Sequence, residues 1–106
     1  MANYVLIYQA PGGAAMGGTP EEQATTMKAW TDWFGKLNGA LVDGGNPATK
    51  TRTISADGSV RDEANGPTGY SIIKADSLDQ AVSLAKGCPV LQGPGNSVQV
   101  VETTAM

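Results

Sequence analysis

Hydrophobic and polar positions along the chain form short apolar runs separated by two longer amphipathic runs. Strands are expected where β-branched, aromatic or other apolar residues follow one another over a few positions. These predicted strands cover residues 3–9, 40–42, 50–55, 69–75 and 97–102. In the first strand Tyr4, Leu6 and Tyr8 share one face. Val5 and Ile7 share the other, so we expect both faces of this strand to be covered.

The first amphipathic run carries the signals of a helix start. Thr19 is the predicted N-cap, Pro20 suits the first helical position, and Glu22 completes a capping box. The predicted helix runs to about Asn38, with Gly39 in a left-handed stop. Its apolar positions recur at spacings of three and four, which predicts one buried stripe. The members of this stripe are Ala24, Met27, Trp30, Phe34 and Leu37.

The second amphipathic run is shorter. Asp76 or Ser77 is its predicted N-cap, and Gly87 ends the helix. The elements therefore run strand, helix, two or three strands, helix, strand. This order predicts an α+β domain of the split βαβ, ferredoxin-like kind, with an antiparallel sheet and two helices on one face. We expect residues 1–106 to form a single domain, because domains of about 100 residues are common.

Two helices cover only one face of such a sheet. Apolar residues in strands 3–9, 69–75 and 97–102 nevertheless point to both faces. A second copy of the chain would cover the remaining face most simply. The sequence therefore predicts a homodimer with twofold symmetry, in which the two sheets pack face to face.

The composition removes several classes of function. The chain has no histidine, which excludes Ser-His and Cys-His pairs and most zinc sites, and we expect no metal or cofactor. A net charge of −3 without a basic stripe argues against nucleic-acid binding. The absence of a long apolar run argues against membrane insertion. The single Cys88 and a start without a signal sequence lead us to expect a cytoplasmic protein.

A glycine-rich segment at residues 12–19 resembles a phosphate-binding loop. Gly18 occupies the position of the motif's lysine, and Pro20 removes a backbone donor from the helix that follows. A mobile flap or a plain connector is the favoured reading of this segment.

Five side chains are the candidate site residues. Asp43, near the end of a short strand, is the candidate general base, although its Gly-Gly-Asn-Pro context also fits a turn. Trp33, off the main apolar stripe, is expected either to line a pocket or to join the core. Tyr8, Asn46 and Tyr70 are the remaining candidates for substrate binding, and strand tyrosines equally fit ordinary packing.

Several segments together resemble the YCII-related family, and its DGPF-type branch in particular. The most specific match is the Gly-Tyr strand that leads into Asp-Ser-Leu-Asp-Gln-Ala, residues 69–81. The other matching segments are residues 5–8, 20–22, 39–45 and 97–102. The resemblance implies a ferredoxin-like dimer with facing sheets. Some family members carry a proposed His-Asp pair, which this chain cannot reproduce, and Asn65-Gly66-Pro67-Thr68 stands at the position of Asp-Gly-Pro-Phe.

Three functional interpretations remain at this point. The first is a small dimeric YCII-related domain that binds a small molecule in a pocket between sheet and helices. The second is a cofactor-independent lyase-like or monooxygenase-like enzyme with Asp43 as base and with Tyr8, Trp33 and Asn46 shaping its pocket. The third is a regulatory partner domain, for which the residues carry no signal.

Overall fold

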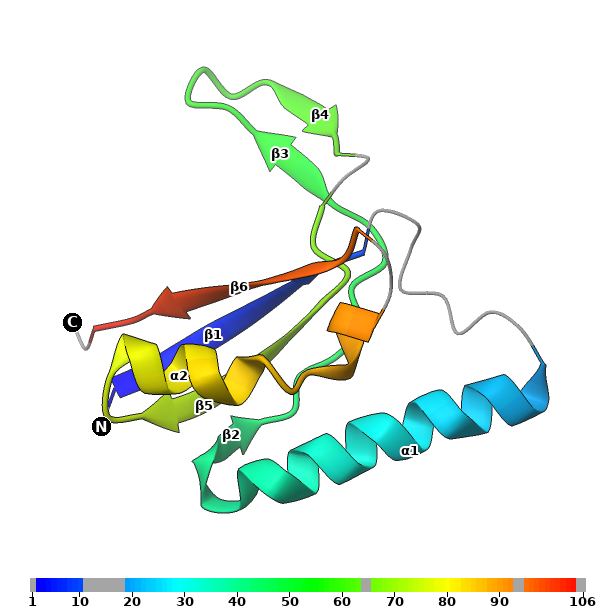
Figure 1. The fold of residues 1–106 in the computed structure, drawn as a ribbon. Coiled ribbons are helices and arrows are strands. Elements are labelled where there is room, and N and C mark those ends of the chain that lie inside the picture. The colour runs from blue at the N-terminus through cyan, green and yellow to red at the C-terminus, as the bar shows by residue number, and fades with distance from the viewer. Residues whose placement is uncertain (1, 11–18, 64–65, 93–94, 105–106) are drawn as a thin grey trace.

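A four-stranded antiparallel sheet forms the centre of the fold in the computed structural model, which describes residues 2–10, 19–63, 66–92 and 95–104. The strands stand in the order β2-β5-β1-β6, with β1 and β5 in the middle (Figure 1). Their bounds are Ala2–Gln9 for β1, Leu41–Asp43 for β2, Gly69–Ala75 for β5 and Ser97–Glu102 for β6. The predicted α+β class and antiparallel sheet are confirmed.

Two helices pack on one face of this sheet. They are α1, Pro20–Leu37, and α2, Leu78–Ala85, and two short 3₁₀ turns follow them at Asn38–Ala40 and Pro89–Gln92. The core between helices and sheet holds Tyr4, Leu6, Ile73, Trp33 and Leu37. Register explains why these residues meet, because Tyr4 lies opposite Ile73 on the neighbouring strand and both point toward the helices.

Both helices begin at side-chain caps. The Oγ1 of Thr19 accepts a hydrogen bond from the Glu22 amide, as predicted. Ser77 is the cap of α2, where its Oγ accepts from the Gln80 amide, and Asp76 is not. The stop of α1 differs from the prediction, because Asn38 and not Gly39 adopts a positive φ, of 48°. With a ψ of −121° Asn38 lies outside the left-handed helical region, so α1 ends one residue early and without the predicted glycine stop.

Only the C-terminal half of α1 belongs to the core. Trp33 and Leu37 are buried, Trp30 and Phe34 are half-buried, and Met27 is 54% exposed. The predicted stripe is therefore wrong over its first half. Helical spacing fixes which residues share a face but not how far along the helix the sheet extends.

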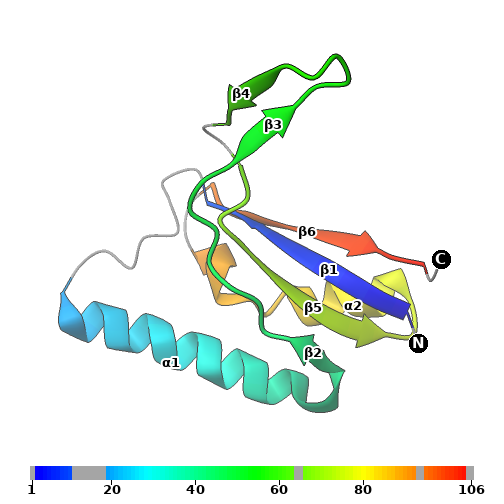
Figure 2. The same ribbon diagram turned by 180° about the vertical axis from the view of Figure 1, so that it is seen from behind.

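A separate two-stranded hairpin departs from the predicted layout. Its strands are β3, Arg52–Ile54, and β4, Val60–Asp62, joined by a turn in which Gly58 has a φ of 89°. Residues 50–55 were expected to form a strand, which β3 confirms in part, but no strand was expected at residues 60–62, where β4 lies. The sequence did not predict β4, because its three residues include one apolar side chain and show no periodicity. The hairpin projects beyond the end of the main sheet (Figures 1 and 2).

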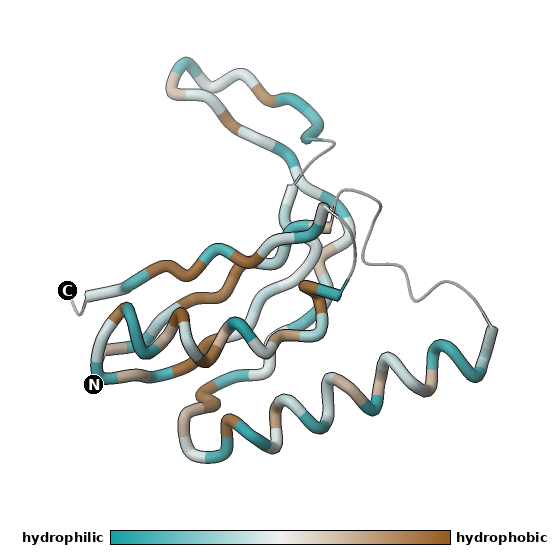
Figure 3. Tube along the Cα trace, in the orientation of Figure 1, coloured by the Kyte–Doolittle hydropathy of each residue, from teal (hydrophilic) through white to brown (hydrophobic). Residues whose placement is uncertain are grey.

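The second face of the sheet is covered by neither helix. Figure 2 shows β1, β5 and β6 from this side, with α2 behind them. We call this surface the open face. Its apolar residues are Val5, Ile7, Tyr70, Ile72 and Val101, all half-buried or exposed. The tube in Figure 3 shows that hydrophobic positions run along these strands and recur in both strands of the hairpin.

The molecule is flat. It measures 44 × 41 × 20 Å, and its radius of gyration is 15.0 Å. A compact domain of 100 residues has a radius of gyration near 13 Å. Among the described residues, no helix combines the length and apolarity that crossing a bilayer requires.

Candidate functional site

A buried chain of hydrogen bonds links three elements beneath the helices. The Tyr8 hydroxyl donates to Ser71 Oγ at 2.7 Å, and Ser71 Oγ donates to the carbonyl oxygen of Gly44 at 2.8 Å. Ser71 is fully buried on β5, directly beside β1. The Tyr8 hydroxyl, Ser71 Oγ and the Gly44 carbonyl oxygen each have a hydrogen-bond partner in this series. The series therefore stabilises the junction of β1, β5 and the segment after β2.

Cys88 lies beside Tyr8 in the same buried region. Desolvation raises the pKa of the Cys88 thiol to about 11, although hydrogen bonds from the Val90 backbone and Tyr8 oppose the shift. Burial likewise raises the pKa of the Tyr8 phenol well above its usual value, against the hydrogen bond with Ser71. Both groups are therefore neutral at pH 7, which makes Cys88 a structural thiol and Tyr8 a hydrogen-bond donor.

An aromatic cluster joins α1 to β1. Trp30 packs edge-on against Tyr8, with ring centroids 5.2 Å apart, and also contacts Trp33 and Phe34. Trp33 Nε1 donates to the carbonyl oxygen of Leu84 at 3.2 Å, which ties α1 to α2. Of the two roles that the sequence left open for Trp33, the structure places it in the core.

The other three candidate residues gather at the exposed edge near β2. Asn46 Nδ2 lies 3.4 Å from the hydroxyl oxygen of Tyr70, to which it donates. The Asp43 carboxylate accepts a hydrogen bond from the Gly45 amide at 2.8 Å, which closes a tight turn. This turn requires glycine, because Gly45 has a φ of 73° and an added Cβ would collide with the Tyr70 carbonyl oxygen.

The five predicted site residues therefore form two groups. Tyr8 and Trp33 lie in the core on the helix side of the sheet, whereas Asp43, Asn46 and Tyr70 are exposed. Tyr70 sits opposite Ile7 on β1, and this register directs it to the open face. The enzyme interpretation places Asp43 in one pocket with Trp33 and Tyr8, an arrangement that these positions do not provide.

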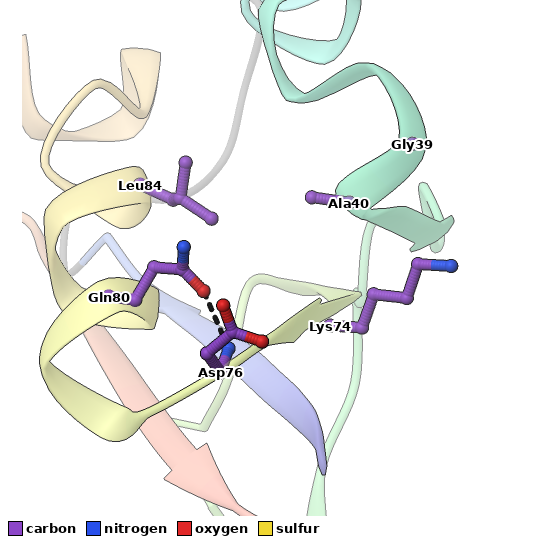
Figure 4. Close-up of a pocket in the computed structure, with 6 residues that line it drawn as sticks. All are labelled: Gly39, Ala40, Lys74, Asp76, Gln80 and Leu84. Atoms are coloured by element: carbon purple, nitrogen blue, oxygen red, sulfur yellow. Dashed lines mark hydrogen bonds between the residues drawn. The ribbon is translucent and has the colours of Figure 1, made fainter. Parts of the chain in front are cut away.

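A shallow pocket lies between α2 and the 3₁₀ turn after α1. Its volume is about 200 Å³, and it is lined by Gly39, Ala40, Lys74, Asp76, Gln80 and Leu84. Figure 4 shows the Asp76 carboxylate and the Gln80 amide directed toward the space between Leu84 and Ala40, while the Lys74 side chain extends away from them. The Asp76 amide donates to Gln80 Oε1, so Gln80 is engaged in closing the start of α2.

Sequence reasoning missed this pocket, because its lining comes from three separate segments of ordinary polar and small residues. Among the described residues, no three His, Cys, Asp or Glu side chains are grouped to hold a metal ion. Residues 12–18 of the glycine-rich segment lie outside the described ranges, and its last residue, Thr19, is the N-cap of α1. No family model matches the chain, and no curated protein sequence is significantly similar to it.

Proposed function

We propose that the chain is a ferredoxin-like domain of the YCII-related type, which pairs with a second copy through its open face and binds a small molecule. The strand order β2-β5-β1-β6 supports the fold assignment. Both β1 and β2 are antiparallel to β5, so they run parallel to each other with β5 between them. The same relation holds for β5 and β6 around β1, and this arrangement supports the proposal of two interleaved βαβ units.

The open face is the observation that carries the proposed dimer. Val5 and Ile72 lie directly opposite each other at its centre, and Val5 also faces Val101. Neither helix covers these side chains. A contiguous apolar surface of this kind on a small domain is typical of an association site.

The charge of the open face favours a second copy as the occupant. Lys74 and Asp43 are its charged residues in the four-strand register, so the face as a whole is neutral although the chain carries −3. When a face packs against the same face of a second copy, any net charge on it meets an equal charge of the same sign and the copies repel. A neutral face avoids this repulsion. Sheets packed in this way lie about 10 Å apart and bury the side chains between them.

The Asp43–Asn46–Tyr70 group is the proposed ligand site. Asp43 and Tyr70 belong to the open face at its β2 edge, and Asn46 donates to the Tyr70 hydroxyl, so the group combines a carboxylate, an amide and a phenol ring. An uncharged polyol or sugar-like molecule suits this set, because its hydroxyl groups donate to Asp43 and its apolar face stacks on Tyr70. Tyr8 supports the segment between Asp43 and Asn46 through Ser71, which donates to the Gly44 carbonyl oxygen, and Trp33 ties α1 to α2 in the core.

Sedimentation analysis of an Ile72→Glu variant tests the proposed dimer. A carboxylate at the centre of the open face would be buried against its own copy, so the variant is expected to sediment as a monomer. Val82→Glu is the matched control, because Val82 is an exposed β-branched residue on α2, on the other side of the sheet. If Ile72→Glu remains as dimeric as Val82→Glu, the open face is not the interface.

Saturation-transfer NMR with a panel of neutral sugars and polyols tests the ligand site. Wild-type protein is expected to transfer magnetisation to at least one panel member, and Asn46→Ala and Tyr70→Ala should remove the signal. Thr53→Ala, on the hairpin, is the control and should leave it unchanged. A signal that survives both site variants would place the ligand elsewhere.

A further inference from the structure

The β3–β4 hairpin has the properties of a binding arm. All its residues from Arg52 to Asp62 are exposed except Thr53, which is half-buried. It is tied together by exposed polar contacts, with Arg52 Nε 3.1 Å from Asp62 Oδ1. A two-stranded hairpin is only marginally stable by itself in water, and exposed ion pairs add little. Among the residues that the structure describes, the hairpin therefore lacks the packing that would hold it in place.

Two apolar side chains stand opposite each other near the tip of the hairpin. Ile54 pairs directly with Val60, and they are 72% and 57% exposed. Alternation along the strands puts them on the same face as the Arg52–Asp62 pair, and puts Thr53 and Arg61 on the other. One face of the hairpin thus presents an apolar pair beside a neutralised ion pair, a surface suited to contact with protein and not with a charged polymer.

The open face by itself is small for a stable dimer. With strands about 4.8 Å apart and a rise of about 3.3 Å per residue, three strands of six to eight residues and the three-residue β2 span about 380 Å² in projection. A standard stable interface takes about 800 Å² from each partner. A dimer through the open face therefore needs further contact area from another element.

We infer that the hairpin is an arm that packs against the second copy of the chain, with Ile54 and Val60 as its contact residues. This inference rests on the dimer proposed above. The hairpin precedes β5, which begins at Gly69, and the next residue of β5, Tyr70, belongs to the open face, so the arm is attached at one end of the proposed interface. The hairpin also projects beyond the end of the four-stranded sheet, where a second copy could contact it (Figure 2).

The dimer dissociation constants of three variants separate the arm from the open face. The double variant Ile54→Ser/Val60→Ser is expected to weaken the dimer at least tenfold. The matched control Leu78→Ser/Val82→Ser changes two exposed apolar residues of α2 and should stay within twofold of wild type. A wild-type dissociation constant for the hairpin variant, together with a monomeric Ile72→Glu variant, overturns the arm and leaves the dimer standing. A dimeric Ile72→Glu variant overturns the dimer proposal itself.

Paramagnetic NMR gives a direct readout of the arm that does not depend on affinity. A nitroxide is attached at Ser59→Cys in a Cys88→Ala background, and this chain is mixed with ¹⁵N-labelled wild-type chain. Since only the second chain is observed, broadening of its amide signals reports contact between copies. We expect broadening confined to one surface patch. Its absence in a mixture shown to be dimeric would overturn the inference, as would uniform broadening across the chain.

Discussion

At the residue scale, a few buried polar atoms determine how the elements meet. Ser71 is the most constrained of them, because it accepts from Tyr8 and donates to the Gly44 carbonyl while fully buried. Trp33 has a comparable position between the helices, where its indole nitrogen reaches Leu84. These contacts join segments that are distant in sequence, so each one fixes a tertiary relation and not a local conformation.

Removing the Ser71 hydroxyl, in the middle of the Tyr8–Ser71–Gly44 series of hydrogen bonds, is expected to lower the unfolding free energy more than removing the Tyr8 hydroxyl at its end. Ser71→Ala leaves a buried phenol and a carbonyl oxygen without this partner, which costs about 1–3 kcal/mol of unfolding free energy. Tyr8→Phe removes one donor while Ser71 still donates to Gly44, and costs about 1 kcal/mol. Urea denaturation measures both. A larger loss for Tyr8→Phe than for Ser71→Ala would contradict the hydrogen-bond order.

Cys88 makes stability depend on alkaline pH. Its pKa is raised from 9.0 to about 11 in the fold, so the native state holds the proton that the unfolded chain releases above pH 9. The stabilisation is complete below pH 9 and is lost as pH rises toward 11. The unfolding free energy of wild type should therefore fall between pH 9 and 10, by an amount of order 1 kcal/mol.

A Cys88→Ala variant provides the comparison for this prediction. It should show a flatter profile than wild type from pH 9 to 10, because the slope that Tyr4 and Tyr8 add through their own raised pKa values is common to both proteins. Equal slopes for the two proteins would show that the thiol is not the group responsible.

At the element scale, local signals predicted where the helices begin, but they did not predict where α1 stops or how far along it the core extends. The caps at Thr19 and Ser77 follow from side-chain chemistry within one turn, and the structure confirms them. The position of the core along α1 does not follow from local chemistry, because it depends on where β1 and α2 meet the helix. Trp33 illustrates this, since its burial comes from the contact with Leu84, which is 51 positions away. β4 was not predicted for a related reason. Its pairing with β3, and not the pattern of its own residues, makes it a strand.

Substitutions along α1 should show the same division between its halves. Leu37→Ala removes a buried side chain and should lower the unfolding free energy by about 2–5 kcal/mol. Met27→Ala, at an exposed position of the same stripe, should change it by less than about 0.5 kcal/mol. Thermal or urea denaturation of the two variants decides the matter. Comparable losses would mean that the first half of α1 is packed as the sequence stripe predicted.

At the scale of the whole molecule, flatness is the dominant property. The molecule is 20 Å thick and measures 44 by 41 Å in its other two dimensions. The helices cover one face of the sheet, so the other face and the hairpin are exposed. The sequence predicted this imbalance from Val5 and Ile7, which follow one another in alternation with buried residues. It did not predict that the candidate site residues would lie on two sides of the sheet. The pairing of Ile7 with Tyr70 puts Tyr70 on the opposite face to Tyr8, and the bulge between Leu41 and Asp43 moves Asp43 to the face of Ile72.

The mass of the wild-type chain in solution tests the central claim most directly. Light scattering at micromolar concentration should give twice the 10.9 kDa of the chain, because the neutral apolar open face of one copy covers that of the other. A single 10.9 kDa species at that concentration would contradict the account, since the open face and the hairpin would then remain in water.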